Sequence, residues 1–188
     1  MCQRKPPSFT TVIAPYQYQF PVDRMVRAFK YSSKFKYGRL MSTLLAEHLL
    51  GTLPSPESHE EPHNSQGFAS PDVILPVPLH WRRQMRRGFN QAEVVARELS
   101  RLLDIPVNTR LLTRIRHTPA QESLSRQQRQ GNLKAAFTVV KSVKNLSLAL
   151  VDDVVTTGST ADAAAHCLMK AGAKQVQIWA IARTPLEK

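Results

Sequence analysis

The stretch that decides the fold is LALVDDVVTTGSTADAAAHCLMKAGA, residues 148–173. Its first four residues are apolar and predict a strand that is buried on both faces. Two carboxylates, Asp152 and Asp153, stand where this strand is expected to end. A short loop of hydroxyl residues and one glycine follows, and an alanine-rich helix is predicted from there to Gly172. The unit is therefore strand, acidic pair, loop and helix.

The loop after the acidic pair has the composition of a phosphate site. At the N-terminus of a helix, successive backbone N–H groups converge on an anion, and hydroxyl side chains add further donors. The two carboxylates would repel a phosphate, but they suit a sugar diol or a hydrated divalent cation. Ordinary helix capping would explain one such residue rather than the whole set. The stretch therefore predicts a site for a ribose 5-phosphate, whose phosphate-binding residues are Thr156, Thr157, Gly158, Ser159 and Thr160.

The segment VDDVVTTGST resembles the phosphoribosyl diphosphate (PRPP) binding motif of type I phosphoribosyltransferases. The resemblance implies that residues 156–160 hold the 5-phosphate and that Asp152 and Asp153 act at the ribose hydroxyls. It also implies Mg²⁺ as cofactor, held by PRPP with help from these two carboxylates rather than by protein ligands alone. Purine-salvage members have a further aspartate where this chain has Thr156, so their general base is not carried over.

Two arginine-rich segments follow other predicted strands. The first comes after the apolar run 71–78 and adjoins a helix predicted over 91–103, with Asn90 as its N-cap. The second is a polar excursion between predicted strands at 111–116 and 137–140, and such excursions are typical of functional or disordered loops. Arginine and helix N-termini both suit phosphate oxygens. Solvated basic loops are the alternative for both segments.

Both segments resemble their counterparts in phosphoribosyltransferases of the ComF/GntX type. That resemblance implies a pyrophosphate loop with Arg87, Gly88 and Asn90, and a flexible loop that closes over the sugar with Arg114, Arg116, Gln121, Arg129 and Asn132. Proteins of this type often carry a small zinc module before the domain. Here Cys2 matches only the last cysteine of that join, so a zinc site is not carried over from the resemblance.

The N-terminal residues 1–50 are expected to form a small hood. An edge strand interrupted at Pro15 and two amphipathic helices are predicted there. Residues 51–70 are rich in Pro, Ser, Glu and His and predict a flexible loop, and residues 71–188 form the expected core domain. Within the hood, residues 29–39 alternate aromatic and basic side chains, a pattern typical of nucleic-acid binding. A solvated helix–turn–helix and a lid over a substrate base are the alternatives.

Composition leaves two classes of partner open. The chain has 188 residues and a net charge of +12, which suits polyanionic small molecules and nucleic acid equally well. No apolar run approaches the roughly 20 residues that span a bilayer, and the first residues lack a signal-peptide core, so a cytoplasmic protein is expected.

Strands that alternate with helices predict an α/β fold with a mostly parallel central sheet, flanked by helices, and ligands at the carboxyl ends of its strands. Two functions fit this expectation. The first is binding of PRPP and magnesium with transfer of ribose 5-phosphate to an acceptor that no motif specifies, releasing pyrophosphate. The alternative is a non-catalytic protein of the same fold that acts in competence and DNA uptake or binds single-stranded DNA.

Overall fold

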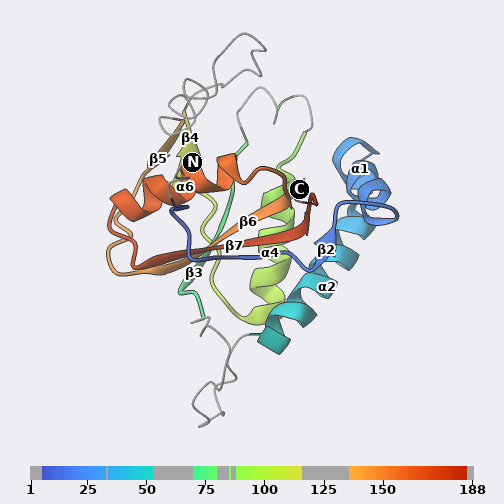
Figure 1. Ribbon diagram of the computed structural model, residues 1–188, viewed down its shortest axis with the longest axis horizontal. Helices are drawn as coiled ribbons and strands as arrows, with labels where there is room; N and C mark the ends of the chain where they lie inside the picture. Colours follow the sequence, from blue (N-terminus) through green and yellow to red (C-terminus); the bar gives the residue numbers. More distant parts are fainter. Residues whose placement is uncertain are drawn as a thin grey trace, which may run out of the picture.

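The computed structural model describes residues 6–32, 34–52, 70–79, 85, 88–115 and 136–185. Its strands and helices are interspersed along the chain (Figure 1). They are β1 (Thr11–Ile13), β2 (Tyr16–Gln17), α1 (Val22–Ser32), α2 (Phe35–Thr52), β3 (Val73–Pro76), α4 (Gln91–Leu103), β4 (Leu112–Arg114), β5 (Phe137–Val139), β6 (Ser147–Val155), α6 (Ser159–Lys170) and β7 (Gln175–Arg183).

The central sheet is parallel, as the alternation of strands and helices predicts. Its strand order is β1-β7-β6-β3, and β2 also pairs with β7. A further parallel bridge joins Ile74 to Val107 beyond β3. β6 and β7 are each nine residues long and almost wholly buried. Strands covered on both faces read as continuous apolar runs, and this is why they stand out in the sequence.

Two separate layers of side chains cover the two faces of the sheet. Leu148 and Leu150 of β6 pack on one side with α6 and the β4–β5 pair. Ala149 and Val151 pack on the other side with α1, α2 and α4. Figure 1 shows this arrangement, with α6 on the opposite side of the sheet from α4. The alternation of facing residues along β6 therefore decides which layer each side chain enters.

An aromatic cluster joins the N-terminal helices to the segment before α4. The ring of Phe89 lies 5.5 Å from that of Phe29 and 4.9 Å from that of Phe35, measured between centroids. Phe29 is fully buried, and a Cβ on Gly38 would come within 2.7 Å of its ring. Glycine is therefore needed at position 38 for α1 and α2 to pack this closely. The cluster places α1 and α2 beside Phe89, just before α4.

β4 and β5 form a separate antiparallel ladder rather than part of the central sheet. They frame the predicted flexible loop, most of which lies outside the described residues. α4 matches its predicted bounds, and Asn90 is its N-cap. Among the helices that the structure describes, none has the length and apolar character to cross a bilayer.

Candidate functional site

The acidic pair lies within β6 rather than after it. The sequence predicted that this strand ends at Val151, but it continues to Val155 because its second half still pairs with β7. Successive residues of a strand point to opposite faces of the sheet. The side chains of Asp152 and Asp153 therefore start out in opposite directions, Asp152 with Leu150 and Asp153 with Val151. The role of both carboxylates at the ribose hydroxyls stays a prediction.

The carboxylate of Asp153 forms an ion pair with a lysine of the N-terminal hood. Its Oδ2 lies 2.8 Å from Nζ of Lys30, a residue of α1, and the two side chains are only 10% and 17% exposed. A charge buried to this extent requires a partner. Lys30 thus ties α1 to the carboxyl end of the central strand, and the carboxylate of Asp153 already has its counter-ion.

Asp152 is half-buried, and its carboxyl is in a different environment. Burial raises its pKa to about 7, and the negative charge of Asp153 adds to the shift. The backbone N–H of Asp153, which donates to Asp152 Oδ1 at 2.8 Å, and the positive charges of Lys30 and Arg114 oppose it in part. Near neutral pH the group therefore exists in both protonation states, and a hydroxyl donor or a cation would favour the carboxylate.

The phosphate-site residues lie between β6 and the first turn of α6. Gly158 adopts a left-handed conformation with φ of 73°, which favours glycine, and it has no side chain with which to cap the helix. The hydroxyls of Thr157 and Ser159 lie 2.9 Å apart, and the Thr157 hydroxyl also accepts from the Ser159 N–H at 3.4 Å. The helix start thus combines backbone N–H groups with exposed or half-exposed hydroxyls, the arrangement that suits an anion.

The predicted pyrophosphate loop starts beside the acidic pair. The N–H of Val77, just after β3, donates to Val151 O at 2.8 Å, so the ends of β3 and β6 are adjacent. Gly88 has a φ of 78°. Asn90 is buried, and its Nδ2 donates to Val77 O at 3.2 Å while its Oδ1 accepts from Ala92 N at 3.1 Å. Asn90 therefore holds α4 against β3, and its place in a pyrophosphate loop stays a prediction. Arg87 lies outside the described residues.

Of the predicted flexible-loop residues, Arg114 is described and lies in β4, at the base of the loop. Its guanidinium lies 5.4 Å from the centre of the Phe137 ring, and its positive charge acts to lower the pKa of Asp152. The others, Arg116, Gln121, Arg129 and Asn132, lie outside the described residues. The structure thus brings Asp152, the loop 156–160, the end of β3 and Arg114 to one end of the sheet.

Magnesium fits the donor set only in partnership with a ligand. Among the described residues, no group of three or more His, Cys, Asp or Glu side chains comes together as a metal site would require. Asp152 is a single hard oxygen donor, and Mg²⁺ is commonly held by one or two carboxylates together with substrate phosphates and water.

Lys30 is the site residue whose role the sequence reasoning missed. It appeared there only as part of the aromatic and basic stretch. The available signal was its position on α1, eight residues after Val22 and four after buried Val26, which places a lysine on the apolar stripe of the helix. A lysine on such a stripe indicates a buried counter-ion.

Comparison with known proteins gives the family. Residues 62–187 match the model of the phosphoribosyl transferase domain. Competence protein F of Haemophilus influenzae is 35% identical over 185 residues, covering 97% of this chain and 76% of its own length. The DNA utilization protein YhgH of Escherichia coli K12 is 35% identical over 183 residues with the same coverage. Competence protein ComFC of Bacillus subtilis is 33% identical over 101 residues, which are 53% of this chain and 39% of that protein.

Solved structures with a similar arrangement include a purine phosphoribosyltransferase from Pyrococcus horikoshii, which is 19% identical. The match covers 77% of this chain and 80% of that one, with a TM-score of 0.42. The glutamine PRPP amidotransferase of B. subtilis is 18% identical, over 77% of this chain and 26% of its own, with a TM-score of 0.46. The domain match, the parallel sheet and the relatives at 35% identity over nearly the whole length agree, and the chain belongs to the ComF family of proteins with a type I phosphoribosyltransferase-like fold.

Proposed function

We propose that this protein works in the uptake or use of DNA and binds PRPP with Mg²⁺ at the carboxyl end of β6. The names of its relatives, competence protein F and DNA utilization protein, support the cellular role. The family model of a phosphoribosyl transferase domain supports the ligand class.

One observation carries the ligand proposal. The half-buried Asp152 stands four residues before a hydroxyl-rich loop, residues 156–160, whose glycine has a positive φ and which leads into a 12-residue helix. In this proposal the loop binds the 5-phosphate, and Asp152 accepts from the ribose hydroxyls. Mg²⁺ would offset the charge of the diphosphate. Asp153 keeps Lys30 as its partner and does not contact the sugar.

Binding of this kind has a pH dependence that follows from Asp152. Its pKa of about 7 means that much of the population carries a proton near neutral pH. A diol that donates to the carboxylate must displace that proton, so we expect affinity for PRPP to rise as the pH increases from about 6 to 8. Binding at pH 7 should release protons to the buffer.

Isothermal titration calorimetry with PRPP and Mg²⁺, at several pH values and in buffers of different ionisation enthalpy, tests this proposal. Asp152→Asn should remove binding, whereas Asp104→Asn, an exposed acid at the end of α4, should leave it unchanged. Equal affinity of the two variants would refute the assignment of Asp152. Absence of PRPP binding by the wild-type protein would refute PRPP as the ligand.

A second candidate function is transfer of the ribose 5-phosphate itself. The positive charge of Arg114 lies near Asp152, at the end of the sheet where a leaving diphosphate would develop charge. In that reaction the C1–O bond to pyrophosphate breaks, and a nucleophilic acceptor forms the new bond at C1. Release of pyrophosphate from PRPP in the presence of nucleobases and amines, lost in Asp152→Asn, would support it. PRPP that stays intact with every acceptor in such a panel leaves the protein a binder of PRPP.

A further inference from the structure

We propose that the groove between α2 and α4 binds a single-stranded nucleic acid through its sugar–phosphate backbone and one stacked base. The groove encloses about 380 Å³ and is lined by Phe35, Arg39, Val94, Arg97, Glu98 and Arg101. This inference rests on the proposed role in the uptake or use of DNA, and it names the surface on which the nucleic acid lies. It is independent of the PRPP site, to which Phe35, Arg39, Arg97 and Arg101 do not belong.

Part of the alternating aromatic and basic stretch, residues 29–39, lines this groove. Phe29 is buried in the core and Lys30 is paired with Asp153, so these two members do not face a partner molecule. Phe35 and Arg39, one helical turn apart on α2, line the groove instead, and Phe35 is 44% exposed. An exposed aromatic ring beside arginine is the usual platform for an unpaired base.

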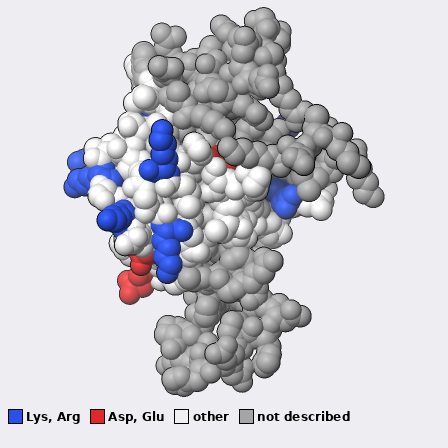
Figure 2. Space-filling view, turned by 60° about the vertical axis from the view of Figure 1, so that its left-hand side comes forward, with Lys and Arg blue, Asp and Glu red and all other residues white. Residues whose placement is uncertain are grey.

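The charges of the groove complement a phosphodiester chain. Three arginines and one glutamate line it, and exposed Lys34 and Lys36 flank Phe35 in the sequence. Arg97 and Arg101 lie one turn apart on the same face of α4, so they can contact successive phosphates. On the face drawn in Figure 2, by contrast, Lys and Arg side chains are spread over the surface as separate groups.

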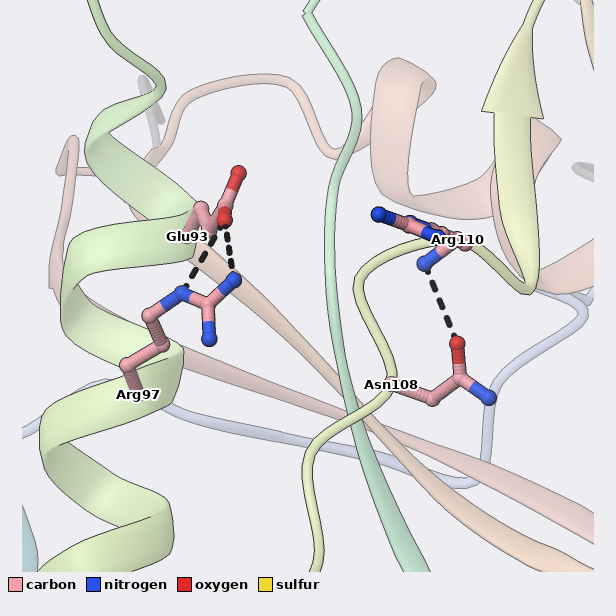
Figure 3. Close-up of polar contacts among 4 residues, drawn as sticks. All are labelled: Glu93, Arg97, Asn108 and Arg110. Atoms are coloured by element: carbon pink, nitrogen blue, oxygen red, sulfur yellow. Dashed lines mark hydrogen bonds and ion pairs between the residues drawn. The ribbon is translucent and has the colours of Figure 1, made fainter.

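The ion pairs within the groove do not prevent this binding. Arg97 donates twice to Oε1 of Glu93, at 3.0 and 2.7 Å, and Figure 3 shows the pair on the side of α4. Arg101 pairs with Glu98 at 2.7 Å. Both arginines remain more than half exposed, at 58% and 67%. Exposed pairs of this type contribute little to stability, and each arginine has further N–H donors for a phosphate.

The test is fluorescence anisotropy of a labelled oligothymidylate of about 15 nucleotides over a range of salt concentrations. The double variant Arg97→Gln/Arg101→Gln should weaken binding at low salt. It should also reduce the slope of log K against log salt by about 1.4, because each lost phosphate contact accounts for about 0.7. The control Lys141→Gln/Lys144→Gln removes the same charge from exposed residues between β5 and β6 and should leave the slope unchanged.

Two single variants separate stacking from charge. Phe35→Leu should lower affinity by about 5- to 100-fold with the salt slope unchanged, since loss of one stacked base costs about that much. Phe35 also packs on Phe89, so Arg39→Gln serves as the variant that leaves the aromatic cluster intact. It should reduce the slope by about 0.7.

Several results would overturn the proposal. One is no binding of the oligonucleotide by the wild-type protein at low salt, and another is equal weakening by the groove and control pairs. Equal competition by a duplex or by a polyglutamate peptide of the same charge would instead indicate duplex DNA or an acidic protein as the partner. Asp152→Asn should lose PRPP but keep the oligonucleotide, and the groove variants should do the reverse. Failure of one proposal is therefore visible separately from failure of the other.

Discussion

Replacing Lys30 by methionine should destabilise the protein by about 3 kcal/mol. At 2.8 Å, the attraction between Lys30 Nζ and Asp153 Oδ2 is roughly 6 kcal/mol for an effective dielectric constant of about 20. Desolvation of the two charges offsets most of that gain, at several kcal/mol per ion. The large effect comes from removing one partner only, because Asp153 is then left buried without a counter-ion. Such a change costs about 3–5 kcal/mol, and the residual 10% and 17% exposure favours the lower end.

Urea unfolding of the single and double variants separates these contributions. Trp179 is fully buried in the layer that α1 covers, so its fluorescence reports on this region. Lys30→Met/Asp153→Asn should recover much of the loss, giving a coupling energy of about 1–3 kcal/mol, whereas exposed Lys34→Met should lie within about 0.5 kcal/mol of wild type.

The same substitution should act on the neighbouring carboxyl. Without Lys30 the pKa of Asp152 loses one of the positive charges that lower it, so the pH at which PRPP affinity rises should move upward. Lys30→Arg, which keeps the charge, should restore both stability and the pH profile. Two results would refute the view that Lys30 offsets the negative charge of Asp152 and Asp153. One is a coupling energy below about 0.5 kcal/mol, and the other is an unchanged pH dependence of PRPP affinity in Lys30→Met.

Three further changes probe the same end of the sheet. Because the folded-state pKa of Asp152 is raised above its unfolded value, stability should fall as the pH rises from about 4 to 7, and Asp152→Asn should remove this slope in pH-dependent urea unfolding; a slope that persists in the variant would contradict it. Gly158→Ala should lower the free energy of unfolding by about 1–2 kcal/mol because of the positive φ at this position, although a Cβ there meets no atom within 4 Å. Gly51→Ala, in helix α2, should instead raise it by up to about 1 kcal/mol. Changes of the same sign for both variants in chemical denaturation would contradict this reasoning. Asn90→Ala should cost about 1–2 kcal/mol in thermal or urea unfolding, and Asn90→Ser less, since its hydroxyl keeps a cap acceptor and only the amide donor to Val77 O is lost. Equal losses would assign no role to the cap.

The sequence predicted the fold well because its strongest signals are local. Buried β6 and β7 read as apolar runs, and α4 is bounded by its cap at Asn90. The separation of the two acids was not predicted, because the end of β6 depends on its pairing with β7 rather than on its own residues. The partnership of Lys30 with Asp153 depends on how α1 packs on the sheet, which no spacing within one element encodes. The roles of Arg87, Arg116, Gln121, Arg129 and Asn132 stay predictions.

The region recognisable as a phosphoribosyl transferase domain begins at residue 62, yet β1 and β2 pair with β7 from before that point. A fragment cut at the boundary of the match would expose one side of β7, whose unpaired backbone groups would be open to pairing with another chain. It would also lack Lys30 and so retain a buried, uncompensated negative charge. The portion that the domain model matches is therefore smaller than the portion that folds, and truncation studies of this family should retain the N-terminal fifty residues.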